Sequence, residues 1–261
     1  MLHGWMDVGA SFQFLVDELE TDWHVLAPDW RGFGQSEWCT DGYWYLDYLA
    51  DLDALLDHFA PTERVRLVGH SLGGNLVNAY AGVRPHRVSH VVSLDGFGLP
   101  EEGPELAPAK ITGWLDALKD PPAFSPYADL AAVADRLQKN NRRLSRDKAE
   151  FLAQHWAIAL PDGSARLASD PRHKLPFPTV YRLEEVFAIW RKVTAPVLWV
   201  AARDSFVQRW LSRQGGSGDA LAERMAVLAD ARCVMIEDAG HMLHHDQPRA
   251  VAQAIEPFLS A

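Results

Sequence analysis

The sequence lacks the features that mark secreted, nucleic-acid-binding or membrane proteins. Its 261 residues include two cysteines, Cys39 and Cys233, which make neither a disulfide framework nor a cysteine-based metal motif. The net charge of −10 argues against nucleic acid or an anionic membrane as a partner. No apolar run approaches the ~20 residues that a membrane-spanning helix needs. The start at Met1 has no signal-peptide pattern, so we expect a cytoplasmic protein.

The sequence does contain a regular alternation of apolar and amphipathic stretches. Apolar runs predict strands at His24–Ala27, Val65–Val68, Val88–Leu94, Val197–Ala201 and Arg232–Glu237. Helical spacing predicts helices at Ser11–Leu19, Tyr43–Phe59, Leu72–Gly82, Ala220–Leu228 and Arg249–Leu259. This order predicts one α/β domain with a doubly wound, mostly parallel sheet.

The strand pattern is interrupted over residues 98–193, which are rich in proline and aromatic residues. Helices are expected there at Trp114–Leu118, Ala128–Asn140, Arg146–Ala159 and Glu184–Lys192. We therefore predict a core of residues 1–97 and 194–261, with a helical cap of residues 98–193 over its active face. The aromatic residues of the cap suggest a small-molecule substrate with an apolar part. The segment Gln214–Gly218 is predicted to be a flexible loop.

One motif organises the chain. The run Gly69-His70-Ser71-Leu72-Gly73-Gly74 follows an expected strand and begins an expected helix, which is the pattern of a nucleophile elbow. Ser71 must stand on a sharp turn above the sheet. Side chains two residues before and after it would collide there, so glycines occupy both places. The sequence therefore predicts that Ser71 is a nucleophile.

A serine hydroxyl needs a base, and the base needs an orienting group. His241 follows one expected strand, Asp204 follows another, and Asp95 ends a third. The order Ser71, Asp204, His241 is the order expected for a triad built on this elbow. Asp204 is therefore the preferred acid. Asp95 remains the alternative acid, or a residue that shapes the hinge of the cap.

Two backbone N–H groups are expected to bind a developing oxyanion. One belongs to Leu72, directly after the nucleophile, and the other to Trp5, directly after His3-Gly4. The histidine-rich run His241–Asp246 invites a metal interpretation. Catalytic zinc also needs a third ligand and a general base at defined spacing, so we predict neither a metal nor a cofactor.

Together these motifs resemble the α/β-hydrolase fold superfamily, in its capped branch of esterases, C–C hydrolases and related enzymes. The residues that carry the resemblance are His3-Gly4-Trp5, Asp29-x-Arg31-Gly32-x-Gly34-x-Ser36, the elbow, Asp204, and Gly240-His241 with Pro248. The resemblance implies that Ser71 attacks, His241 acts as base and Asp204 orients it. Dehalogenases and epoxide hydrolases of this superfamily carry Asp at the nucleophile, and Ser71 argues against both.

The beginning of the chain departs from the family pattern. Members have three strands before the His-Gly loop, the third in mid-sheet beside the elbow strand, and only Met1-Leu2 remains of it here. We therefore expect the N-terminal strands to be missing. Pairing between His24–Ala27 and Val65–Val68 is predicted to be weak or absent.

The sequence thus predicts a serine hydrolase that cleaves a small carboxylic ester or related acyl compound through an acyl-enzyme. One alternative is a C–C bond hydrolase that acts on diketone-type ring-cleavage products with the same triad. Another is a ligand-binding protein of this fold with negligible turnover.

Overall fold

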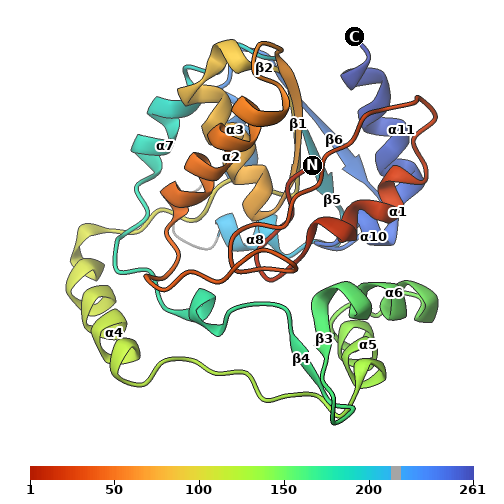
Figure 1. The fold of residues 1–261 in the computed structure, drawn as a ribbon. Coiled ribbons are helices and arrows are strands. Elements are labelled where there is room, and N and C mark those ends of the chain that lie inside the picture. Colours follow the sequence, from red (N-terminus) through yellow and green to blue (C-terminus); the bar gives the residue numbers. More distant parts are fainter. Residues whose placement is uncertain (213–218) are drawn as a thin grey trace.

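The computed structural model describes residues 1–212 and 219–261. The loop predicted at Gln214–Gly218 lies outside these residues. The central sheet has four parallel strands in the order β1 (Val65–His70), β2 (Val88–Leu94), β5 (Val197–Ala202) and β6 (Ala231–Ile236). All four were predicted, and Figure 1 shows them side by side in the upper half of the molecule.

Helices cover both faces of this sheet, because successive strand residues point to opposite sides. One face packs on α2 (Tyr45–Phe59), α3 (Leu72–Val83), α7 (Leu183–Trp190) and α8 (Val207–Ser212), with α9 (Ala220–Met225) beside them. The other face packs on α1 (Gln13–Val16), α10 (Leu243–Asp246) and α11 (Pro248–Leu259). In β5, Trp199 belongs to the first side, and its neighbours Leu198 and Val200 belong to the second. The predicted doubly wound sheet is confirmed.

Some predicted boundaries were wrong. The helix expected over Ser11–Leu19 is a 3-10 turn, η1 (Gly9–Phe12), followed by the short α1. The helix expected to continue to Ala159 ends at Trp156, and its last three residues instead form a strand. Short-range apolar spacing does not reveal where pairing with another segment replaces helical bonds.

The segment between β2 and β5 is helical, apart from one hairpin. It contains η3 (Pro104–Leu106), α4 (Ala107–Lys119), α5 (Leu130–Asn140), α6 (Arg146–Trp156), β3 (Ala157–Ala159), β4 (Ala165–Leu167), η4 (Pro171–Lys174) and α7. Strands β3 and β4 pair antiparallel, and α5 and α6 enclose a small core of their own. Figure 1 shows α4, α5, α6 and the hairpin below the sheet, whereas α7 lies beside α2 and α3.

The first residues of the chain lie directly against the elbow strand. The Leu2 N–H donates to the Val68 carbonyl at 2.8 Å, and the His70 N–H donates to the Leu2 carbonyl at 3.0 Å. On the other side, the amino group of Met1 donates to the Leu26 carbonyl at 2.5 Å. Residues 24–27 form no strand, so that prediction was wrong. Within the described residues no backbone hydrogen bond joins them to β1, as predicted.

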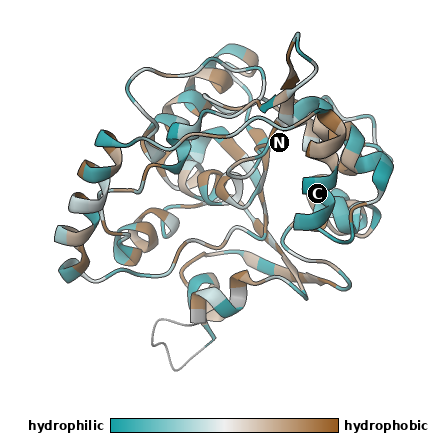
Figure 2. Cartoon of the chain, turned by 90° about the horizontal axis from the view of Figure 1, so that it is seen from below, coloured by the Kyte–Doolittle hydropathy of each residue, from teal (hydrophilic) through white to brown (hydrophobic). Residues whose placement is uncertain are grey.

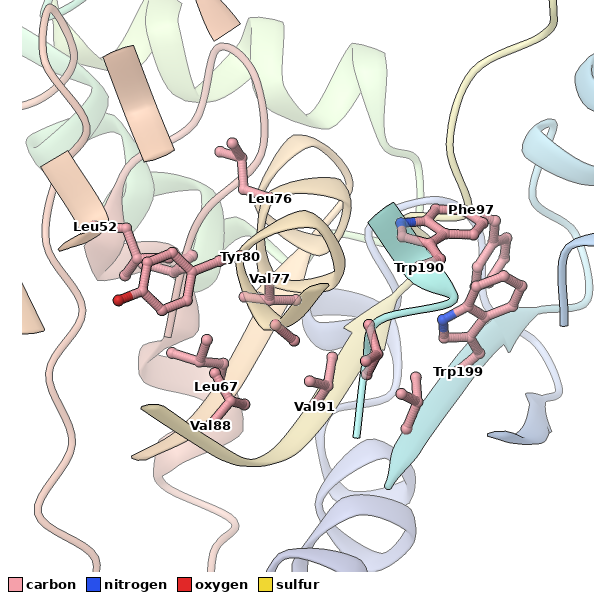
Figure 3. Close-up of a cluster of buried hydrophobic side chains, with 14 of the residues drawn as sticks. Leu52, Leu67, Leu76, Val77, Tyr80, Val88, Val91, Phe97, Trp190 and Trp199 are labelled. Atoms are coloured by element: carbon pink, nitrogen blue, oxygen red, sulfur yellow. The ribbon is translucent and has the colours of Figure 1, made fainter. Parts of the chain in front are cut away.

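The apolar core is continuous across the layer that contains α3. Figure 3 shows Phe97, Trp190 and Trp199 grouped at one end and Leu76, Val77 and Tyr80 on α3 at the other. Figure 2 shows apolar residues concentrated on the central strands and mixed polarity on the surrounding helices. Within the described residues, no helix is both long and apolar enough to span a membrane.

Removing a core side chain from α3 should be costly. Leu76 is 0% exposed, so Leu76→Ala should lower the free energy of unfolding by about 2–5 kcal/mol, because a cavity replaces its packing contacts. The matched control is Leu46→Ala on α2, where the leucine is 71% exposed and the change should stay within about 0.5 kcal/mol. Urea unfolding followed by circular dichroism measures both. Equal losses in the two variants would contradict the packing described.

Candidate active site

Ser71 lies between β1 and α3 in a strained backbone conformation. Its φ of 53° and ψ of −113° place a non-glycine residue at positive φ. The turn is held by the Ser71 N–H, which donates to the Leu94 carbonyl at 2.9 Å. A Cβ on Gly69 would lie 2.2 Å from the Gly73 carbonyl oxygen, and one on Gly73 would lie 2.0 Å from that of Leu2. The glycines are therefore required by close backbone approach, as the sequence predicted.

Three side chains form a continuous hydrogen-bonded relay. The Ser71 Oγ lies 3.0 Å from His241 Nε2. The other ring nitrogen of His241, Nδ1, lies 2.6 Å from Asp95 Oδ2. The Asp95 carboxylate is fully buried, whereas the His241 ring is about one quarter exposed. This geometry fits a hydroxyl nucleophile, a base, and an acid that orients the base.

The preference for Asp204 as the orienting acid was wrong. Its carboxylate is 47% exposed and accepts a hydrogen bond from Arg143 Nη2 at 2.6 Å, away from His241. Asp95, the alternative, occupies the position instead. Both residues follow strands of one parallel sheet, so sequence spacing could not separate them. Asp95 lies nearer to the nucleophile because it follows β2, which pairs directly with the elbow strand β1. Asp204 follows β5, which does not pair with β1.

Sequence reasoning missed Ser205, which supports the acid. The Ser205 Oγ donates to Asp95 Oδ2 at 2.5 Å and accepts from the Val207 N–H at 3.1 Å. Ser205 is buried, and it directly follows Asp204. The segment that follows β5 therefore does contribute to the relay, but through a hydroxyl rather than through the carboxylate beside it. A lone serine beside the favoured aspartate gave no signal of its own.

The two predicted oxyanion donors belong to segments that adjoin the nucleophile. Leu72 begins α3, and the loop that carries Trp5 packs on the elbow, since a Cβ on Gly4 would lie 3.2 Å from Ser71 Cβ. Within the described residues, no group accepts a hydrogen bond from the Trp5 N–H. The Trp5 side chain is half exposed, and its Nε1 donates to the His173 carbonyl at 3.3 Å. The arrangement leaves the Trp5 N–H available to a ligand.

The loop of residues 29–36, which precedes α2, is fixed by hydrogen bonds. The Trp30 N–H donates to His3 Nε2 at 2.9 Å, and the Trp30 indole donates to the His3 carbonyl at 3.1 Å. Arg31 pairs with Asp51 at the surface of α2 and takes no part in the relay. The Asp29 carboxylate accepts from the Gly9 N–H at 2.7 Å. These bonds give Asp29 and Arg31 structural roles.

His173 connects the inserted segment to this loop. Its ring stacks on Phe33, with centroids 3.8 Å apart, and on Tyr43, 3.6 Å apart. The Tyr48 hydroxyl lies 3.1 Å from His173 Nδ1. Burial disfavours a charged ring here and lowers the pKa of His173 to about 4. The inserted segment is therefore joined to the loop that carries Phe33 by a neutral, stacked histidine ring, and to Trp5 by the His173 backbone carbonyl.

Further histidines lie buried behind His241. Burial lowers the pKa of His70 and of His244 well below the usual value, and that of His245 to about 3. Burial raises the pKa of Asp7 to about 7. One donor atom from each of Asp7, His70 and His244 lies within 4.8 Å of the others. These three residues are the group within the described chain that could hold a metal ion.

The family model described as the alpha/beta hydrolase fold matches residues 1–248, so this chain belongs to that family. A serine hydrolase-like protein of Danio rerio is 27% identical, with 99% of this chain and 80% of that protein covered. The 3-hydroxybutyrate-oligomer hydrolase of Cupriavidus necator is 28% identical, with 99% and 87% covered. Among solved structures, a hypothetical protein of Pseudomonas aeruginosa superposes with a TM-score of 0.85 at 26% identity, covering 100% of this chain and 90% of that one. The family and these relatives support a hydrolase.

Acid should destabilise the protein partly through His173. Its pKa of about 4 in the folded chain lies below the ordinary 6.5, so the unfolded chain binds more protons between those values. The free energy of unfolding should therefore fall as the pH drops from about 6.5 to 4, and His173→Phe should show a smaller fall.

The difference between the parent and His173→Phe stability curves isolates His173, because titrating groups common to both proteins cancel. Asp7 acts in the opposite sense: its raised pKa stabilises the fold at low pH and loses that effect as the pH rises toward about 7. Subtracting the His173→Phe curve from the parent curve cancels this contribution. The exposed His86, changed to Phe, serves as control and should retain the parent's acid loss. Identical pH slopes for parent and His173→Phe would contradict the assignment.

Proposed function

We propose that this chain is a serine hydrolase that cleaves small carboxylic esters, or closely related acyl compounds, through an acyl-enzyme. The observation that carries the proposal is the relay of Ser71, His241 and Asp95, with hydrogen-bond distances of 3.0 and 2.6 Å. A serine on a strained turn with no adjacent base would be an ordinary hydroxyl. Here the base lies within reach, and the base has its own buried carboxylate.

In this proposal the reaction proceeds by two acyl transfers. His241 Nε2 takes the Ser71 proton while Oγ attacks the ester carbonyl, and the N–H groups of Leu72 and Trp5 bind the oxyanion. The same nitrogen then protonates the departing alcohol. Water, deprotonated by His241, attacks the acyl-enzyme, which releases the carboxylic acid and restores Ser71. Each oxyanion donor contributes roughly 3 kcal/mol to such a transition state.

Asp95 orients the base and stabilises its protonated form. Its carboxylate accepts a hydrogen bond from the Nδ1–H of His241, which leaves the Nε2 lone pair free to accept from Ser71. The Ser205 hydroxyl holds the same carboxylate oxygen and so limits its rotation. The acid role that the sequence favoured for Asp204 is thereby assigned to Asp95.

The surroundings of His241 favour an acyl substrate with an apolar part. The Phe206 ring lies 5.0 Å from the His241 ring, centroid to centroid, and is 52% exposed. An exposed aromatic face beside the base offers binding surface to an alkyl or aryl group.

We assign substrate selection to residues 98–193 as a cap. This segment contacts the core beside the relay through the side-chain pairs Arg143–Asp204, Asn141–Asp246 and Trp156–Asp7. Of the core residues in these pairs, Asp204 directly precedes Ser205, and Asp246 is the last residue of α10, which follows His241. Movement of the cap would therefore alter access to the nucleophile without changing the relay itself.

Kinetics on a substrate panel test the proposed function. A series of p-nitrophenyl esters from acetate to decanoate should be hydrolysed with repeated turnover. Ser71→Ala should lower kcat/KM by at least about 10³-fold, because the nucleophile is lost. A vinylogous diketone tests C–C cleavage in parallel. Preferred turnover of the diketone would assign a C–C hydrolase instead, and at most a single turnover on every substrate would assign a ligand-binding protein.

A further inference from the structure

Behind His241 lies a buried group of polar side chains that the proposed hydrolysis does not use. Asp7 belongs to the loop after Trp5, His70 is the last residue of β1, and His244 lies on α10. Their exposed fractions are 3%, 1% and 0%. One ligand-type atom from each lies within 4.8 Å of the other two. Three segments distant in sequence therefore place an oxygen and two imidazole nitrogens around one point.

Three of the four ring nitrogens of His70 and His244 lack a hydrogen-bond partner within the described residues. His70 Nε2 lies 2.8 Å from the His241 carbonyl and donates to it, so the proton is on Nε2 and the lone pair is on Nδ1. His70 Nδ1 then has no hydrogen-bond partner, and neither ring nitrogen of His244 has one. Buried polar atoms are almost always satisfied, so these nitrogens indicate that a further group binds here.

The Asp7 carboxylate, in contrast, is held by hydrogen bonds. Asp7 accepts from the Ser11 hydroxyl at 2.8 Å and from the Trp156 indole at 3.0 Å. Within the described residues no lysine or arginine pairs with it. A buried carboxylate without a cation is costly when ionised. Hydrogen bonds that orient a ligand side chain, as here to the two oxygens of Asp7 and from His70 Nε2, are typical of metal sites.

We propose that Asp7, His70 and His244 bind a divalent transition-metal ion of the zinc class. Two imidazole nitrogens and one carboxylate oxygen suit zinc and its neighbours, whereas calcium and magnesium prefer oxygen ligands alone. The sequence did not reveal this site, since the histidine run after His241 supplies one ligand only. His70 and Asp7 come from parts of the chain more than 170 residues earlier.

An ion at this place would affect the proposed hydrolysis. His70 directly precedes Ser71, and its ring lies 4.8 Å from the His241 ring, centroid to centroid. A divalent charge so close repels the positive charge that His241 acquires when it takes the serine proton. The metal-loaded protein should therefore turn over esters more slowly than the metal-free protein. Binding itself does not depend on the protein being an esterase.

Metal content and thermal stability test the site directly. The whole protein is stripped with a chelator, incubated with Zn²⁺ or Co²⁺ long enough for local opening, and passed through a desalting column. We expect one ion per chain by elemental analysis, a tetrahedral-type Co²⁺ absorption spectrum and a higher Tm. His244→Gln and Asp7→Asn should each weaken affinity by at least about tenfold and remove the rise in Tm.

The control variant distinguishes this site from surface binding. His86 is exposed and lies outside the group, so His86→Gln should retain one ion per chain. Circular dichroism of the stripped variants checks that each is folded, and either folded variant suffices for the comparison. The proposal is overturned if the parent retains no ion, or if folded Asp7→Asn or His244→Gln retains it with unchanged affinity. Slower ester turnover on loading, restored by chelation, is a separate readout that bears only on the link to catalysis.

Discussion

The active-site geometry depends on the parallel pairing of β1 with β2. In their register His70 lies opposite Leu94, so the next residue on each strand, Ser71 and Asp95, leave the sheet side by side. The hydrogen bond from the Ser71 N–H to the Leu94 carbonyl extends this pairing into the elbow itself. Nucleophile and acid are thus positioned by backbone hydrogen bonds. His241 needs only to lie between them.

Close backbone packing makes this arrangement rigid. Gly73 lies against Leu2, and Gly69 lies against the first turn of α3, at separations that no side chain would fit. Both Ser71 and Asp95 have positive φ, at 53° and 51°. Strain of this kind persists only where the surroundings determine the conformation, and here the sheet and α3 together do so. The buried hydroxyl of Ser205, in the segment after β5, adds a third constraint on Asp95.

Much of the fold could be predicted because its signals are local. Apolar runs identified the four sheet strands, and the glycines around Ser71 identified the elbow. The choice between Asp95 and Asp204 could not be made in this way, because it depends on strand order and on the partner of each carboxylate. Arg143, which pairs with Asp204, comes from the inserted segment and has no sequence link to it. The Asp7, His70 and His244 group could not be predicted either, because its three residues are brought together only by the fold.

Residues 24–27 were predicted to form a strand because of their apolar character. In the structure the Met1 amino group donates to the Leu26 carbonyl, and residues 24–27 form no strand.

The most direct test of this account compares the two aspartates in ester hydrolysis. Asp95→Asn should lower kcat by about 10⁴-fold, since the amide no longer holds the required tautomer of His241. Asp204→Asn removes an exposed ion pair with Arg143 and should leave kcat nearly unchanged. A large loss in Asp204→Asn together with a nearly unchanged Asp95→Asn would contradict the relay and return the acid role to Asp204.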